Sequence, residues 1–345
     1  MHAPVTPAAA DTPIVAVRDL QVTFTGGTRP LQAVNGVDLA VARGESLALI
    51  GESGSGKSVT LRSLLRLHPE RRTKIAGSIE VAGQSVLDLS GRALADYRGR
   101  VVSMIFQEPL LALDPVYTVG VQIVEAIRRH ERIGVAEARK RALELFERVH
   151  IPSAARRLDA YPHEMSGGMR QRAMIALALA CRPQVLLADE PTTALDATVQ
   201  IQILLLLREL QRDLGLTIIF VTHDMGAAVE VADRFAVMYA GRIVEEGATR
   251  EIVRHPRHPY TLALMQARAD GAMSKGARLA TIGGAPPDLA NLPPGCAFAE
   301  RCAFAQQDCR SVLPTPLELG AQHRVRCLHA ELTAPVRAAA ETVTA

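Results

Sequence analysis

Short apolar runs alternate with amphipathic segments from Ile14 to about Gly247. Each run has the length and the β-branched content of a buried strand, and the clearest predicted strands are 47–50, 101–106, 185–189, 217–222 and 235–240. Between them, apolar residues recur at helical spacing in 58–67 and 119–149. Strands that alternate with helices in this way predict an α/β domain with a largely parallel sheet.

The pattern changes near residue 250, where prolines become frequent and long periodic segments become rarer. We therefore predict two parts, a main domain over 13–250 and a smaller C-terminal extension over 251–345. Residues 1–12 are rich in alanine, proline and threonine and are predicted to be loosely ordered.

A glycine-rich loop, "GESGSGKSVT" at 51–60, directly follows the first of these strands. Glycine lets the backbone N–H groups approach one anion, and the following helix adds its positive N-terminus. The spacing Gly51-x-x-x-x-Gly56-Lys57-Ser58 fits a phosphate-binding P-loop, in which the lysine reaches the phosphates and the serine binds Mg²⁺. A flexible turn is the alternative, but the flanking strand and helix favour a nucleotide site. The predicted ATP contacts here are Gly51, Ser53, Gly54, Ser55, Gly56, Lys57, Ser58 and Val59.

An acidic pair ends the predicted strand "VLLAD" and continues into "EP". Asp189 would bind the Mg²⁺ shell, and Glu190 would orient or deprotonate a water molecule near the γ-phosphate. Such a pair also occurs as an ordinary helix N-cap. Its combination with a P-loop favours the role in hydrolysis.

The segment "MSGGMRQR" at 165–172 resembles the signature motif of the ABC ATPases. Ser166, Gly167 and Gly168 place a hydroxyl and flexible amides at a helix N-terminus, which suits a phosphate but carries no lysine. An isolated motif of this kind would be only a capped helix. In the resembled family it completes the nucleotide site of the opposite subunit, so each site needs two chains.

The resemblance implies roles for three further residues. Gln107 in "MIFQEP" resembles the Q-loop glutamine, which contacts Mg²⁺ and the attacking water, and Asp196 in "TTALD" resembles the D-loop. His223 in "FVTHD" resembles the switch histidine. The implied fold is a P-loop ABC ATPase domain with a RecA-like core, a helical subdomain and an antiparallel β subdomain.

The adenine contact is the least defined part of the predicted site. ABC ATPases often stack adenine on an aromatic residue of an early loop, but Gly26 stands near that position and Phe24 precedes it. We expect Phe24 to be a core strand residue.

Five longer segments resemble the ATPase subunits of bacterial dipeptide and oligopeptide importers, over about residues 13 to 330. They are "MIFQEPLLALDPVYTVG", "YPHEMSGGMRQRAMIALALA", "ADEPTTALDATVQIQIL", "VEEGATREIV" and "HPRHPYTLALM". Met165 and Asp114 depart from the usual residues without removing a catalytic group. The implied partners are a second, paralogous ATPase, two transmembrane permease subunits and an extracytoplasmic solute-binding protein.

Composition narrows the function classes. The net charge of the 345 residues is +3, and no basic block is interleaved with aromatic residues, so nucleic-acid binding is not expected. The longest apolar runs fall short of the roughly 20 residues that cross a bilayer, and the N-terminus lacks the pattern of a secretory signal. We expect a peripheral protein at the cytoplasmic face of the bacterial inner membrane.

Four cysteines, Cys296, Cys302, Cys309 and Cys327, lie in the C-terminal extension. Their spacing leaves three alternatives open: zinc, an iron–sulfur cluster, or no metal. Zinc sites usually show tight Cys-x-x-Cys pairs, which this segment lacks. Resemblance to the extension of peptide-importer ATPases implies a [4Fe–4S] cluster. Cys181, in an apolar helical run, is expected to be a buried thiol.

Other functions within the ABC ATPases are also considered. The ATPase of a related nickel, glutathione or murein-peptide importer would share all these motifs. A soluble ABC ATPase of DNA repair or translation would carry a long coiled-coil insertion or two tandem cassettes, and the sequence has neither.

Overall fold

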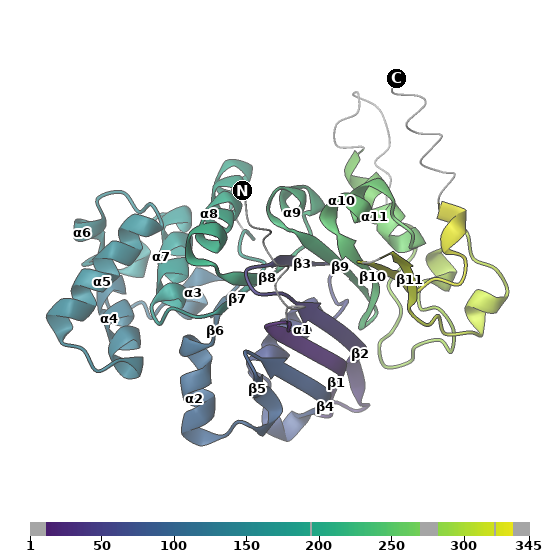
Figure 1. Ribbon diagram of the computed structural model, residues 1–345, viewed down its shortest axis with the longest axis horizontal. Helices are drawn as coiled ribbons and strands as arrows, with labels where there is room; N and C mark the ends of the chain where they lie inside the picture. Colours follow the sequence, from purple (N-terminus) through teal and green to yellow (C-terminus); the bar gives the residue numbers. More distant parts are fainter. Residues whose placement is uncertain (1–11, 194, 270–281, 321, 334–345) are drawn as a thin grey trace, which may run out of the picture.

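The computed structural model describes residues 12–193, 195–269, 282–320 and 322–333. It consists of a central eight-stranded sheet, a smaller four-stranded sheet and helices that cover both faces of the central sheet (Figure 1). The predicted N-terminal stretch 1–12 lies almost entirely outside the described residues. None of the helices in the described ranges is long and apolar enough to span a membrane.

The central sheet has the strand order β11-β12-β10-β9-β3-β8-β7-β6. Its five parallel strands are β3 (Ser46–Ile50), β6 (Val102–Ile105), β7 (Val185–Asp189), β8 (Thr217–Thr222) and β9 (Arg234–Tyr239). Every side chain of β3, β7 and β8 is buried, which explains their continuous apolar runs. The five predicted strands are confirmed to within two residues.

The second sheet is antiparallel, with the order β2-β1-β4-β5. Its strands are β1 (Val15–Phe24), β2 (Leu31–Val41), β4 (Thr73–Val81) and β5 (Gln84–Ser85). Helix α1 (Lys57–Leu64) contacts strands of both sheets and buries Leu61 and Leu64 between them. The helix that follows the P-loop is thus fixed on two sides.

The helices form the remaining layers (Figure 1). The longer ones are α2 (Gly91–Arg100), α4 (Val119–His130), α5 (Val135–Arg148), α7 (Gly167–Leu179), α8 (Ala197–Leu214) and α11 (Pro259–Ala269). The shorter ones are α3 (Pro109–Ala112), α6 (Ala154–Arg157), α9 (Met225–Val231) and α10 (Thr249–Arg254). Short 3₁₀ helices are η1 (Glu70–Arg72), η2 (Val86–Asp88), η3 (Pro162–Glu164), η5 (Ala299–Arg301), η6 (Asp308–Arg310) and η7 (Ala330–Thr333).

The helical segment predicted over 119–149 is two helices, because the chain turns at 131–134 between α4 and α5. An unbroken helix of that length would extend about 45 Å and could not bury its whole apolar face against one core. After the turn, Ile123 and Ile127 of α4 share a core with Ala138 and Phe146 of α5.

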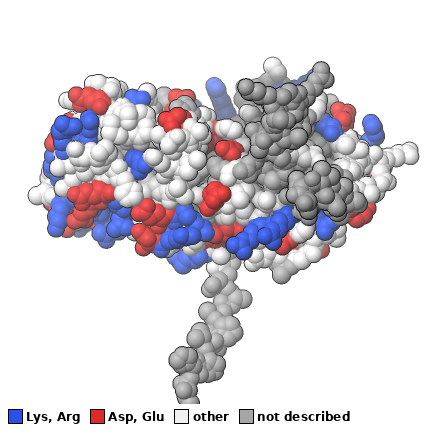
Figure 2. Space-filling model, turned by 90° about the horizontal axis from the view of Figure 1, so that it is seen from above, with Lys and Arg blue, Asp and Glu red and all other residues white. Residues whose placement is uncertain are grey.

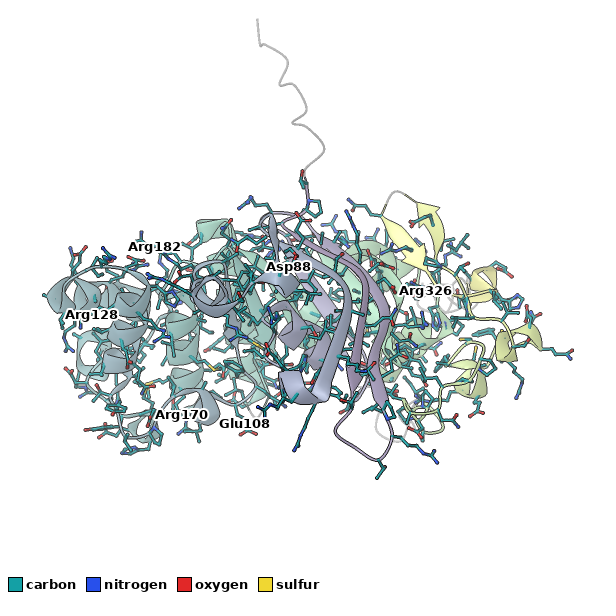
Figure 3. The ribbon with its side chains drawn as sticks, turned by 90° about the horizontal axis from the view of Figure 1, so that it is seen from below. Asp88, Glu108, Arg128, Arg170, Arg182 and Arg326 are labelled. Carbon is teal, nitrogen blue, oxygen red and sulfur yellow. The ribbon has the colours of Figure 1, made fainter. Side chains whose placement is uncertain are left out.

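The C-terminal extension continues the central sheet. Strand β12 (His323–Val325) pairs with β10 (Arg242–Ala248), and β11 (Leu317–Gly320) pairs with β12, all antiparallel. Arg326, labelled in Figure 3, lies 3.6 Å from Asp38 of β2, measured between Nη2 and Oδ2. The extension therefore contacts both sheets.

Candidate functional site

The carboxyl ends of four parallel strands bring the candidate catalytic residues to one edge of the central sheet. Ile50 of β3 pairs with Thr222 of β8, and Asp189 of β7 pairs with Val221. Ile105 at the end of β6 pairs with Ala188. Because the P-loop, His223, Glu190 and Gln107 follow these strand ends directly or within two residues, the parallel topology places them together, at the edge where α/β sheets bind ligands.

Glycine is required in the P-loop by close packing against β9 and β2. A Cβ atom on Gly51 would lie 2.2 Å from the carbonyl oxygen of Met238, and one on Gly56 would lie 2.6 Å from that of Ala33. Gly56, with φ of 104°, is the N-cap of α1. Ser53 and Gly54 are exposed at the tip of the loop, where a Cβ on Gly54 would meet no atom within 4 Å.

Lys57 is buried beneath this loop, with 5% of its surface exposed. Its Nζ donates hydrogen bonds to the carbonyl oxygens of Gly51 at 2.7 Å and Glu52 at 2.8 Å, and lies 3.4 Å from Ser55 Oγ. Burial lowers the pKa of Lys57, while the charges of Glu190, Asp189 and Glu52 oppose that shift. The ammonium group is held inside the loop by backbone oxygens.

Asp189 is 1% exposed and both of its carboxylate oxygens contact α1. Ser58 Oγ donates to Oδ1 at 2.6 Å, and Arg62 Nη2 lies 3.2 Å from Oδ2. Hydroxyl and carboxylate oxygens are the ligands that Mg²⁺ prefers. Ser58 and Asp189, two of the three residues predicted to bind Mg²⁺, are therefore adjacent, and Arg62 is a neighbour that the sequence analysis missed.

Glu190 has three polar neighbours at its Oε2 atom. Thr193 Oγ1 donates at 2.9 Å, while Gln107 Nε2 and His223 Nδ1 each lie 3.5 Å away. The structure thus brings the three predicted catalytic side chains together. Thr193 was not predicted, although it lies in the "TTALD" segment three residues after Glu190.

The Ser166 turn and Asp196 begin two neighbouring helices. Ser166 Oγ accepts from the N–H of Met169 at the start of α7, and Asp196 Oδ1 accepts from the N–H of Val199 at the start of α8. A Cβ on Gly168 would lie 3.0 Å from Val199, and one on Gly167 would lie 3.5 Å from Leu195. Among the described residues, no hydrogen bond or ion pair joins this turn to the P-loop of the same chain.

Phe24, at the end of β1, packs against the core between the two sheets, as expected for a strand residue. Its ring also meets that of His68 edge to face, with centroids 5.6 Å apart. Gly26 lies beside the aliphatic part of Arg72, since a Cβ there would be 3.0 Å from Arg72 Cδ.

The four cysteines of the extension line one small cavity together with Phe298 and Phe304. Gly295 makes their approach possible, because a Cβ there would lie 2.3 Å from the carbonyl oxygen of Cys309. The N–H of Cys296 donates to that same oxygen at 2.8 Å. Backbone N–H groups also point to the sulfurs of Cys302 and Cys309, at 3.4 and 3.5 Å.

The spacing of these sulfurs bears on which metal group fits. A tetrahedral zinc site with Zn–S bonds of about 2.3 Å holds its sulfurs within about 4 Å of one another. Among the described residues, the only three potential ligands that come within 4.8 Å of one another are Asp308, Cys309 and His329. A [4Fe–4S] cluster binds each thiolate through a different iron and separates the sulfurs further. No three of the four cysteine sulfurs, all within the described residues, lie within 4.8 Å of one another.

Burial raises the pKa of the thiols of Cys296, Cys302 and Cys327, to about 12 for Cys327, with added repulsion from the neighbouring cysteines. Thiolates here need a bound cation to replace their protons. Cys181, expected to be buried, is instead half-buried just after the end of α7, and burial raises its pKa to about 11.

The comparisons with known proteins agree on a family. Residues 34–193 match the family described as ABC transporter, and residues 244–309 match the oligopeptide/dipeptide transporter C-terminal region. A putative peptide import ATP-binding protein of Brucella melitensis is 48% identical over 92% of this chain and 97% of its own length. A probable peptide ABC transporter ATP-binding protein of Sinorhizobium fredii is 47% identical over 91% of this chain and 94% of its own.

Solved structures support the same assignment. A dimeric ATP-binding cassette in a post-hydrolysis state with ADP and phosphate aligns with a TM-score of 0.62 and 30% identity, over 68% of this chain and 99% of its own. A component of an ABC transporter complex from Clostridium perfringens aligns with a TM-score of 0.61 and 29% identity, over 70% of this chain and 91% of its own. With the P-loop, the carboxylate pair and the capped α7 in one chain, these matches show that the chain belongs to the ABC transporter ATP-binding proteins and is an ABC-type ATPase.

Proposed function

We propose that this ATPase energises the uptake of dipeptides or oligopeptides across the bacterial cytoplasmic membrane, as a peripheral subunit on its cytoplasmic face. The names of the relatives as peptide import proteins support this substrate class, and so does the match of residues 244–309 to the oligopeptide/dipeptide transporter region. We place the boundary between the ATPase domain, 13–250, and the extension, 251–345, two residues after the end of β10.

The convergence of Gln107, Thr193 and His223 on Glu190 is the observation that carries the hydrolytic role. In our proposal the amides of the P-loop hold the phosphates, and Lys57 exchanges its loop carbonyl contacts for phosphate oxygens. Glu190 then orients the attacking water and accepts its proton, while His223 keeps the carboxylate aligned. Ser58, Gln107 and Asp189 would hold Mg²⁺, which neutralises charge on the phosphates.

A second ATPase subunit completes each site in this proposal. The helix N-terminus at Ser166, Gly167 and Gly168 suits a γ-phosphate but contacts the start of α8 rather than its own P-loop. Asp196 begins that helix, beside the same surface. The dimeric form of the solved cassette supports such a head-to-tail arrangement, whether the partner is identical or a paralogue.

The permease contact is proposed at the segment that follows β6. Four large apolar side chains of this segment have 38 to 69% of their surface exposed, which favours a partner surface; they are Phe106, Leu110, Val116 and Tyr117. Figure 3 shows Glu108 of this segment and Arg170 of α7 along the same edge of the molecule. Two permease subunits and an extracytoplasmic solute-binding protein would complete the importer.

Figure 2 shows charges of both signs interspersed on the visible face, which does not favour a nucleic-acid partner.

We assign Cys296, Cys302, Cys309 and Cys327 as the ligands of a [4Fe–4S] cluster, supported by their shared cavity and by the N–H groups directed at two sulfurs. Such a cluster would cross-link a segment with few regular elements and can carry one electron. Anaerobically purified protein should show visible absorption that dithionite bleaches, together with about four iron atoms per chain. Colourless protein with one zinc per chain would contradict the assignment.

Reconstitution tests the proposed function. The chain, co-expressed with its membrane subunits and its second ATPase, is placed in proteoliposomes with ATP inside and the cognate binding protein outside. Uptake of a labelled peptide should require ATP and should be lost when Lys57 is replaced by Ala. Nickel carried by the binding protein would refute the peptide substrate, and co-purification with nucleic acid instead of membrane subunits would refute the transport role.

A further inference from the structure

An arginine of the C-terminal extension pairs with the P-loop. Arg301 Nη1 lies 2.7 Å from Glu52 Oε2, and its Nη2 lies 2.9 Å from Oε1, so the guanidinium donates two hydrogen bonds to the carboxylate in a bidentate pair. The Arg301 side chain is only 5% exposed. Such two-point pairs combine charge with a fixed geometry.

Every N–H donor of Arg301 has a partner. Besides the two bonds to Glu52, Nε donates to the carbonyl oxygen of Gly283 at 2.8 Å, and Nη2 donates to that of Ile282 at 3.2 Å. Nη1 donates to Tyr239 Oη, also at 3.2 Å. A guanidinium with five satisfied donors has one orientation, and that orientation points at the P-loop.

Aromatic rings support this arrangement on both sides of the domain boundary. The guanidinium carbon of Arg301 lies 5.8 Å from the ring centres of Tyr239 on β9 and of Phe298 in the extension. Tyr260 of α11 accepts a hydrogen bond from the backbone N–H of Glu52 at 2.7 Å through its hydroxyl. Glu52 is therefore held through both its backbone and its carboxylate by residues outside the main domain.

The position of Glu52 makes its charge important. It follows Gly51 directly, its carbonyl oxygen accepts from Lys57 Nζ, and its carboxylate is among the charges that raise the pKa of Lys57. A carboxylate that acts on the phosphate-binding lysine also repels a polyphosphate at the same place. Without a counter-charge, Glu52 would oppose the binding of ATP.

We propose that Arg301 is a positioning residue of the nucleotide site, which cancels the charge of Glu52 and thereby lets the C-terminal extension set the affinity for ATP. This inference rests on the nucleotide site proposed above. It gives the extension a role in the ATPase cycle beyond the binding of a metal cluster. Arg301 contacts the P-loop through Glu52 and directly precedes Cys302, which lines the cysteine cavity. It therefore links the two sites.

A charge-based set of variants tests the proposal. The affinity of the full-length protein for a fluorescent ATP analogue, mant-ATP, is measured for wild type, Arg301→Met, Glu52→Gln and the double variant. We expect Arg301→Met to weaken binding about tenfold, the size of one screened charge interaction. Glu52→Gln should change it less than about threefold, and the double variant should recover to within about threefold of wild type.

The matched control is Arg324→Met, because Arg324 is another arginine of the extension that pairs with a glutamate, Glu246, at 2.9 Å. It should change the affinity less than about twofold. The loss of mant-ATP affinity in Arg301→Met should also become smaller at 0.5 M KCl, because a Debye length of about 4 Å screens the charge of Glu52. A purely structural defect would not depend on salt in this way.

Two results would overturn the inference while leaving the ATPase assignment intact: unchanged affinity in Arg301→Met, or a double variant as weak as Arg301→Met. If Arg301→Met does not fold, Glu52→Gln still decides, because a tenfold loss there would show that the carboxylate is needed rather than cancelled. Failure of the wild-type protein to bind mant-ATP would instead refute the nucleotide site itself.

Discussion

Replacement of Glu190 by Gln separates the chemical step from nucleotide binding. Oε2 of Glu190 receives a hydrogen bond from Thr193 at 2.9 Å and has Gln107 and His223 at 3.5 Å. A glutamine side chain keeps the length and one oxygen for Thr193, so the loop after β7 should keep its shape. What it loses is the ability to accept a proton from water.

The size of the effect follows from that single loss. A positioned general base contributes about 10²- to 10⁴-fold to a rate, which corresponds to about 3 to 5 kcal/mol of activation free energy. We therefore expect kcat to fall by about 10²- to 10⁴-fold. Affinity for mant-ATP should stay within about threefold of wild type, because Glu190 makes no phosphate contact in the proposed site.

Single-turnover hydrolysis of radiolabelled ATP measures the rate, and light scattering after gel filtration measures the assembly, with the second ATPase present. The slow variant should accumulate as an ATP-bound two-subunit particle, since the ATP at its own P-loop remains intact at the interface. Glu147→Gln, at an exposed carboxylate of α5, is the control and should behave as wild type. A rate loss below tenfold, or a variant that stays monomeric with ATP and partner, would refute the role given to Glu190.

Three further predictions concern the P-loop, the tyrosine that supports it and a half-buried thiol. Tyr260→Phe should lower the free energy of unfolding by about 1 to 3 kcal/mol in urea titrations, because the fully buried ring keeps its volume while the N–H of Glu52 loses its acceptor; an unchanged midpoint would contradict this. Gly51→Ala should weaken mant-ATP binding about a hundredfold, because its Cβ would meet a carbonyl oxygen of β9 at 2.2 Å. Gly54→Ala, the matched control with open space around it, should lose less than about tenfold. Burial raises the pKa of Cys181 from 9.0 to about 11. At pH 8 the folded chain should therefore react with iodoacetamide at this thiol about a hundredfold more slowly than the unfolded chain, as measured by peptide mass spectrometry. Equal rates in the two states would show that the thiol is not protected.

The strands of the fold and the residues that meet at the site could be predicted because each depends on a short stretch of sequence. Buried parallel strands appear as continuous apolar runs, so β3, β7 and β8 were visible in the sequence. Once the sheet is parallel, the residues after its strands must meet at one edge, so the nearness of Gln107, Glu190 and His223 follows from their positions alone. The division between α4 and α5 was missed, because the amphipathic period continues through residues that turn only when both helices share a core.

The sequence by itself determined the class of protein, the phosphate-binding loop and the residues available for hydrolysis, because each depends on a few neighbouring positions. Only the tertiary structure decided which of 39 lysines and arginines meets Glu52, since Arg301 lies 249 positions away and is selected by the rings of Tyr239 and Phe298. Charge attraction acts between any opposite pair that packing brings close. A sequence lists the charges, but the pairing is set by the surfaces that exclude water around them.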